Sequence, residues 1–454
     1  MSDMLSIGAS GVRAYQTALA TVGENIANVS TVGYARRAVV LNEVAGGSGS
    51  TNGYGAGNGV YLSGVNRATE GYSATALRAS TSDLTRTTKG AEWLDRIQNA
   101  LTGNQLNSRV TAFFGSAQAL AAEPDSTALR TGMLSAASSA ALAFKATGQA
   151  FDQVDADLQT AGNQAAQTLT SLGNSLTKIN EGLSRSQPGS TAAAQLKDQR
   201  DTILSQLSEL VDVDVKMDSL GRASVKLGGP EGPAFVQGAM AGTVTYTRND
   251  NGSATFSVIN GSTVTDIVPN GGALAGIADG AGRVSAIRQS LNLVAGSFVK
   301  SVNDNQAAGV DQKGAAGTAM FQVGKSPTDI SIADAFVDGS KIAAAKAASG
   351  TTPAGGVRDS SNLAALESTR MSQKFEASLT TLVTDNATAY KQKNTIANAQ
   401  TAIRDGAATA LSAATGVNLD SEAVDLIRFQ QAYAASSRVI QIARETMQTI
   451  LDIR

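Results

Sequence analysis

The chain has 454 residues, of which 42% are hydrophobic and 16% charged, and its formal net charge is -2 at pH 7. It contains no Cys and no His, which excludes disulfides, thiol chemistry and the commonest general base and metal ligand. We therefore expect a protein that is not an enzyme and that holds no cofactor or metal ion. Lys and Arg form no cluster that could neutralise a row of phosphates, so we also expect no nucleic-acid partner.

The length allows several domains with ample buried cores. The first residues, Met1 to Leu5, lack the basic segment and the unbroken apolar run of a secretory leader. No run of about 18 apolar residues, the length needed to span a bilayer, occurs in the chain. We expect no membrane insertion, and either a cytoplasmic protein or one that is exported without a cleaved signal peptide.

An amphipathic helix is predicted for the first residues of the chain, ending near Asn28. Its apolar side chains recur every seven residues in two lines, as in a coiled coil. The lines comprise Leu5, Val12, Leu19 and Ile26, and Tyr15, Val22 and Val29. After this helix, Gly33 supplies the residue of positive φ that a turn favours.

A glycine-rich loop at 46–59 and a short strand from Val60 follow, and helical periodicity then dominates. The apolar spacing from Phe144 to Leu183 predicts one rod-like helix, which ends before Pro188. A shorter helix extends to Leu210. These helices indicate an elongated antiparallel bundle.

The pattern changes at residue 211, where alternating apolar residues begin. The runs 243–247, 254–259 and 263–268 are separated by Asn-Gly pairs, which predicts a meander of hairpins. Helical spacing returns after residue 272 and again from Met371 to Ile403, whereas 309–361 is rich in Ala and Gly and indicates loops.

The last forty residues predict a second interaction helix. Its seam is formed by Leu419, Leu426, Tyr433, Ile440 and Met447. Burying five or six such side chains yields on the order of 10 kcal/mol gross, while ordering a helix costs about 1 to 2 kcal/mol per residue. Each terminal helix therefore needs a partner, and the other terminal helix is the first candidate.

The fold class expected is mainly α with a β insertion: an elongated antiparallel bundle, paired terminal coiled-coil helices, and a small antiparallel β domain in the middle of the chain. The predicted domains are 1–45 with 415–454 (terminal coiled coil), 46–210, 275–320 and 365–414 (helical bundle), and 211–274 (outward-facing β-rich domain, with 321–364 as a candidate extension). The terminal segments thus enclose the bundle segments along the chain, and these enclose the β-rich segment. This order predicts that both termini lie at one pole of the molecule and the middle of the chain at the other.

Three constellations could suggest catalysis or phosphate binding. The run 319–326 ends like a phosphate-binding loop but lacks the first glycine and the flanking strand and helix. Ser175 and Lys178 have a serine–lysine spacing without its partner motifs. The group Asp198-Gln199-Arg200-Asp201 would need a cleft for acid–base work, so a structural ion-pair cluster is the favoured interpretation.

The stretch Asn25-Ile-Ala-Asn28-Val-Ser-Thr31-Val-Gly33-Tyr34 resembles the N-terminal signature of bacterial flagellar rod, hook and hook-associated proteins. Val32 stands where that family usually has proline. The resemblance extends through 59–67, 196–201, 271–274 and 417–440 in the same order. Beyond the first stretch, the family-motif residues are Asp198, Gln199, Arg200, Asp201, Gln430 and Gln431.

The resemblance implies a structural axial component of the flagellum, of the hook-associated kind, which joins hook to filament and is required for filament assembly. It implies an extracellular location and type III export without a cleaved leader, with a chaperone held on the C-terminal helix. The implied partners are further copies in a helical ring, hook subunits, a filament-side junction protein and flagellin. The implied inner-tube interface comprises Leu5, Val12, Tyr15, Leu19, Val22, Ile26, Leu419, Leu426, Tyr433, Ile440 and Met447.

Two alternatives remain open at this point. One is another axial subunit of hook or rod type, or a surface-displayed flagellin-like protein. The other is a hydrolase that acts on polysaccharide through paired carboxylates.

Overall fold

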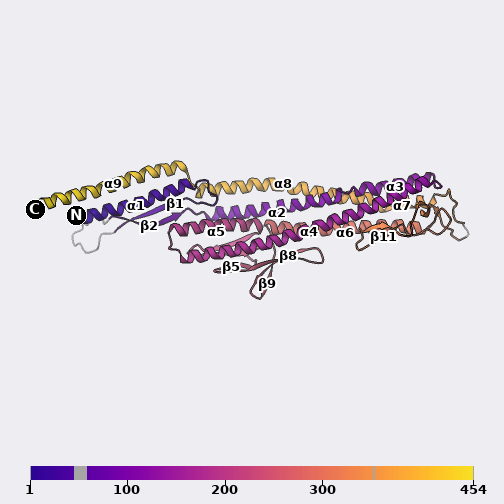
Figure 1. Ribbon diagram of the computed structural model, residues 1–454, viewed down its shortest axis with the longest axis horizontal. Helices are drawn as coiled ribbons and strands as arrows, with labels where there is room; N and C mark the ends of the chain where they lie inside the picture. The colour runs from indigo at the N-terminus through magenta and orange to yellow at the C-terminus, as the bar shows by residue number, and fades with distance from the viewer. Residues whose placement is uncertain (1, 45–58, 351–352, 453–454) are drawn as a thin grey trace.

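The computed structural model describes residues 2–44, 59–350 and 353–452, so most of the expected glycine-rich loop lies outside the described residues. The molecule is elongated, with both termini at one end and a helical rod extending away from them (Figure 1). The helices are α1 (Ser2–Ala27), α2 (Gly71–Thr102), α3 (Leu106–Ala122), α4 (Thr127–Arg185), α5 (Thr191–Leu210), α6 (Gly272–Ala307), η1 (Gly339–Lys341), α7 (Ser361–Gln373), α8 (Phe375–Thr415) and α9 (Leu419–Asp452). No helix in the described ranges is both long and apolar enough to cross a membrane.

The strands form small antiparallel sheets. One ribbon pairs β1 (Arg37–Glu43) with β2 (Val60–Arg67). Mid-chain, one sheet has the order β3 (Val213–Met217), β4 (Ala223–Leu227), β5 (Ala234–Gln237), β6 (Met240–Ala241), and a second has the order β7 (Thr243–Arg248), β8 (Ala254–Asn260), β9 (Thr263–Ile267). Two further pairs are β10 (Gly309–Val310) with β13 (Ala345–Lys346), and β11 (Phe321–Val323) with β12 (Ile330–Ile332). These elements confirm a mainly helical fold with an antiparallel β insertion.

The helix α4 forms the backbone of the rod and has 59 residues. It begins where the hydroxyl of Ser126 accepts a hydrogen bond from the amide of Leu129, an N-cap that satisfies one free donor of the first turn. Its apolar stripe is buried against α3, α5 and α6 in one continuous core. The predicted rod-like helix is thus present, and it starts earlier than Phe144.

One helix expected from Met371 onward is interrupted. The helix α7 ends at Gln373, Lys374 has a left-handed conformation with φ of 53°, and α8 begins at Phe375. The break turns the Phe375 ring into the aromatic cluster, where it lies 5.9 Å from Phe114 and 5.7 Å from Phe298. A single continuous helix is therefore wrong here, because tertiary packing of Phe375 overrides the local periodicity.

The β insertion lies on the flank of the rod, against α4, and the far end is built from α3, α7 and the short strands near β11 (Figure 1). The expectation that the middle of the chain forms the opposite pole is therefore wrong. Two glycines of α4 explain why the β insertion lies against this helix. A Cβ atom at Gly162 would lie 2.6 Å from the Tyr246 ring, and one at Gly173 would lie 2.5 Å from the Phe235 ring. Each glycine thus leaves room for one aromatic ring of the β insertion.

Candidate functional site

The two terminal helices pack side by side, as predicted, and small residues form their seam. A Cβ atom at Gly8 would lie 2.6 Å from Cγ1 of Ile440, and one at Gly11 would lie 3.1 Å from Cβ of Ser436. The helices are antiparallel, since residues 8 and 11 of α1 meet residues 440 and 436 of α9. Close approach of the two backbones depends on these glycines, since a larger side chain would separate them.

The residues predicted for the interface lie in and beside this seam. Val22 is buried. The rings of Tyr15 and Phe429 lie on opposite sides of the seam, with their centroids 6.3 Å apart. The half-buried members are Leu5, Val12, Leu19, Ile26, Leu426 and Ile440. Leu419, Tyr433 and Met447 are 50%, 37% and 49% exposed. The heptad lines therefore border the seam, and part of their apolar surface, mainly on α9, faces solvent.

Asn25, the first residue of the family motif, is fully buried where α1 meets α9. Its side-chain amide donates to the carboxylate of Glu422 at 2.9 Å and to the backbone carbonyl of Arg37 at 2.8 Å. Its Oδ1 accepts from the hydroxyl of Tyr34 at 2.8 Å and from the amide of Arg37 at 3.0 Å. Asn25 therefore uses its donors and acceptor to tie the start of α9 to the chain that follows α1.

Glu422 is also fully buried and completes this cluster. Besides Asn25, its carboxylate pairs with Arg36 at 2.6 Å. Glu422 lies in the first turn of α9, where an acidic side chain interacts favourably with the helix dipole. In the structure, Glu422 joins the two ends of the chain.

Burial raises the pKa of the Tyr34 hydroxyl to about 12, against the lowering effect of the guanidinium of Arg37. That guanidinium lies over the Tyr34 ring, 4.7 Å from its centroid. The hydroxyl therefore stays protonated at neutral pH and keeps donating to Asn25.

The charged group on α5 meets the β1–β2 ribbon. Asp198 pairs with Arg37 at 2.8 Å and with Arg67 at 2.6 Å. Asp201 pairs with Arg67 at 2.8 Å and with Arg200 at 2.6 Å. These carboxylates are therefore engaged by guanidinium groups in a structural ion-pair network.

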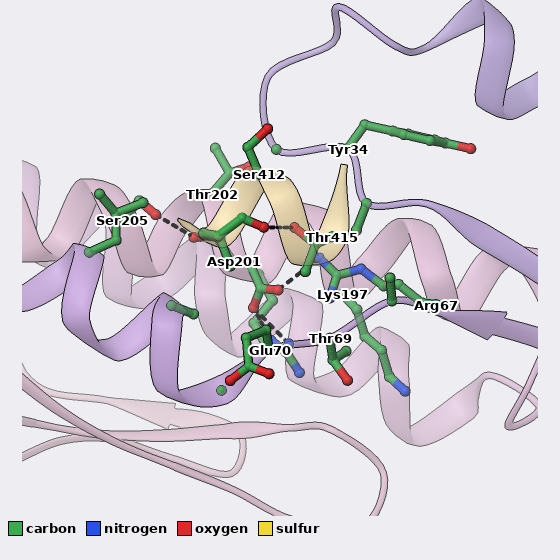
Figure 2. Close-up of a pocket in the computed structure, with 18 of the residues that line it drawn as sticks. Tyr34, Arg67, Thr69, Glu70, Lys197, Asp201, Thr202, Ser205, Ser412 and Thr415 are labelled. Atoms are coloured by element: carbon green, nitrogen blue, oxygen red, sulfur yellow. Dashed lines mark hydrogen bonds and ion pairs between the residues drawn. The ribbon is translucent and has the colours of Figure 1, made fainter. Parts of the chain in front are cut away.

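A cleft of about 1140 Å³ opens beside this network, between the Tyr34 loop, α2, α5 and the end of α8. Figure 2 shows side chains from these segments around it, including Asp201, Lys197 and Thr415. Arg78 also lines the cleft, and burial lowers the pKa of its guanidinium. The cleft marks the joint between the terminal helix pair and the rod.

The remaining motif residues are less involved in the joint. Thr31 donates to Asn28 at 3.2 Å within the turn after α1. Gly33 has φ of 84°, and a Cβ atom there would lie 2.5 Å from the Thr202 hydroxyl. Gln199 on α5 and Gln430 and Gln431 on α9 are exposed.

Several joint residues were not among the predicted site residues. They are Gly8, Gly11, Arg36, Arg37, Arg67 and Glu24, whose carboxylate pairs with Arg37 at 3.0 Å. Small residues at 8, 11, 14 and 18 have the spacing of a helix face, and this signal could have located the seam. The adjacent Arg36 and Arg37 directly follow the motif, which was a weaker signal.

The joint places this protein in a class of elongated structural subunits whose two ends pair beside a helical rod. Both ends match flagellar rod families: residues 5–34 match "Flagella basal body rod protein", and residues 411–453 match "Flagellar basal body rod FlgEFG protein C-terminal". Residues 91–321, just over half of the chain, match "Flagellar hook-associated protein FlgK helical domain". The chain belongs to this family of flagellar hook-associated proteins, whose members are structural proteins of the flagellum and not enzymes.

Individual relatives agree with this assignment. The chain is 26% identical to flagellar hook-associated protein 1 of Escherichia coli over 72% of its length and 61% of the relative's. It is 29% identical to the Salmonella typhimurium protein of that name, over 53% of this chain and 44% of the relative. These two alignments thus span only about two fifths to three fifths of the relatives' length. The Bacillus subtilis protein of the same name is 23% identical over 97% of this chain and 96% of its own.

A solved structure shows the same fold. The flagellar hook junction protein FlgK from Burkholderia pseudomallei superimposes with a TM-score of 0.63 at 15% identity, covering 74% of this chain and 99% of that one.

Proposed function

We propose that this protein is a structural adaptor that joins the flagellar hook to the filament and is required for filament assembly. One observation carries the proposal. The terminal helices pair at one end of the rod, while the apolar lines bordering their seam stay partly open to solvent, most of all on α9. Such a surface on a helix pair is suited to packing against further helices. Membership of the hook-associated family and the names of the relatives support the junction as the place of action.

The proposed partners follow from this surface. Copies of the chain form a helical ring through a repeated head-to-tail contact, with their terminal helices as the inner tube. Hook subunits lie below the ring, and a filament-side junction protein and flagellin lie beyond it. In this division, 1–45 with 415–454 form the tube domain. The helical rods of the copies in the ring surround the tube, and the β insertions face outward.

We also propose that the protein is exported through the flagellar channel without a cleaved leader and acts outside the cell. An export chaperone would hold the C-terminal helix beforehand. Exposed apolar side chains on α9 support this, since they need cover before assembly: Val424, Ile427, Ile442, Ile450 and Leu451.

A second candidate function is that of another axial subunit, of rod or hook type. The matches of both chain ends to rod families favour it. The match over 91–321 favours the hook-associated role instead, because this family model is that of a hook-associated protein and it covers much of the helical bundle of this chain.

The substitution Ile440→Glu tests the proposal. Ile440 contacts Gly8 in the seam and is half-buried, so a carboxylate there would separate the terminal helices, since a partly desolvated charge without a cationic partner is unfavourable. We expect cells carrying this variant to form hooks without filaments. The purified variant should keep the helical circular dichroism and melting temperature of the rod.

The neighbouring substitution Gln441→Glu is the matched control, because it adds the same charge at an exposed position of α9. We expect filaments of normal length with this control. Normal filaments in the Ile440→Glu strain would contradict the proposed role of the terminal helices.

A further inference from the structure

The hydrophobic core of the rod ends before the joint. Among the described residues, the continuous core cluster extends along the chain from Trp93 to Leu379. It includes no residue of α1, β1, β2 or α9. The terminal helix pair and its ribbon are therefore not anchored to the rod by a shared apolar core.

Polar contacts bridge this boundary instead, and Asp198 of α5 lies at their centre. Its Oδ2 accepts from Nη2 of Arg37 on β1 at 2.8 Å, and its Oδ1 accepts from Nε of Arg67 on β2 at 2.6 Å. One carboxylate of the rod thus holds both strands of the ribbon. Nearby, the amide of Val65 donates to the backbone carbonyl of Gly189 at 2.7 Å, a contact that a side-chain change leaves in place.

The ribbon is in turn hydrogen-bonded to the terminal helix α1. The backbone carbonyl of Arg37 accepts from Asn25 of α1, and the amide of Val60 donates to the hydroxyl of Ser10 at 3.1 Å. We propose that Asp198 is a positioning residue that sets the orientation of the terminal helix pair relative to the rod. It does so through Arg37 and Arg67, without being part of the terminal helices.

The contact requires a carboxylate rather than any polar group. Both oxygens of Asp198 accept from guanidinium groups, whereas an asparagine has one acceptor oxygen and turns its NH₂ donors toward the other guanidinium. Asp198→Asn therefore removes the contact to one of the two guanidinium groups, and so weakens the hold on one strand of the ribbon, while changing almost no volume. The side chains of Arg37 and Asp198 are only 3% and 14% exposed, so dissolved salt screens their contact weakly.

Spin labels test this inference in the full-length chain, which has no native cysteine. We would place one label at Asn42→Cys on β1 and one at Gln164→Cys on α4, both exposed positions. Electron paramagnetic resonance then gives the distribution of distances between ribbon and rod. We expect a single narrow distribution for the parent chain, and one at least twice as broad with Asp198→Asn.

Two further variants make the result specific. Asp201→Asn should broaden the distribution less, because Asp201 contacts only Arg67 of the ribbon. Asp157→Asn removes a carboxylate–guanidinium contact of similar length, although a more exposed one, inside the rod, to Arg96 at 2.6 Å, and should leave the distribution unchanged. Circular dichroism of each variant verifies that the rod is folded.

A parental distribution in the Asp198→Asn chain would overturn the inference, as would equal broadening in Asp157→Asn or a broad distribution in the parent itself. The consequence that misoriented terminal helices assemble poorly rests on the proposed function. The distance measurement uses the isolated chain, so the inference and the proposed function can fail separately.

Discussion

Single buried polar side chains determine how distant parts of this chain meet. Asn25 and Glu422 are fully buried and hydrogen-bonded to each other, although they are almost the whole chain apart. At the far end of the rod, Arg130 is buried and donates to the backbone carbonyls of Pro124 and Ile342, both at 2.8 Å. Removing one partner of such a contact leaves the other unsatisfied, which costs about 1 to 3 kcal/mol.

Asp212 gives a prediction at this scale. Burial raises the pKa of its carboxyl group above the ordinary value, while its Oδ1 accepts from the amide of Asn270 before α6. The folded state thus holds this proton more tightly than the unfolded state. The stability that the protonated Asp212 carboxyl contributes is fully present below the ordinary pKa of about 3.9. It is lost as pH rises through the pKa of this group in the folded state.

Asp212→Asn keeps an acceptor for Asn270 and removes the charge. We therefore expect the free energy of unfolding of the variant to rise relative to the parent as pH increases from about 4 toward neutrality. Urea denaturation of both chains across this range measures it. A difference that is constant with pH, or that falls, would show that burial of the Asp212 charge is not a stability cost.

At the scale of elements, the helix α4 positions the β insertion. Gly162 and Gly173 leave space for the rings of Tyr246 and Phe235, and the Thr170 hydroxyl accepts from the amide of Val244 at 2.9 Å. Asp155 on the same helix pairs with Arg248 of β7 at 2.7 Å. These contacts hold the insertion against the flank of the rod.

Alanine at these glycines tests the arrangement. We expect Gly162→Ala or Gly173→Ala to destabilise the protein by about 1 to 3 kcal/mol, because each new methyl group would overlap an aromatic ring. Gly132→Ala is the matched control on α4, where nothing lies within 4 Å, and should stabilise by roughly 0.5 to 1 kcal/mol. Chemical denaturation gives all three values, and equal effects at the three sites would contradict the account.

Periodicity in the sequence predicted elements whose apolar side chains are large, such as α4 and the hairpins of the β insertion. It did not predict β1 or the break at Lys374, which depend on contacts with segments distant in the chain. The seam of Gly8 and Gly11 carries little hydrophobic signal because its residues are small. The partners Arg37 and Asp198 are 161 residues apart, so no local pattern could have paired them.

The whole molecule has its two ends together at one end of a rod and its β insertion on the flank (Figure 1). Paired termini with open apolar borders suit a subunit that is completed by its neighbours. In the proposed assembly, the rod and the insertion form the outer part. A subunit that matches two different lattices, hook and filament, needs a defined orientation between these parts, and we propose that the polar contacts of Asp198 supply it.

Deletion of the gene tests the central claim most directly. Electron microscopy of the cells and analysis of the culture medium would follow, with a plasmid copy of the gene to restore the parent phenotype. An adaptor predicts bare hooks and unpolymerised flagellin in the medium. Cells that still carry normal filaments would contradict the role proposed for this protein at the junction.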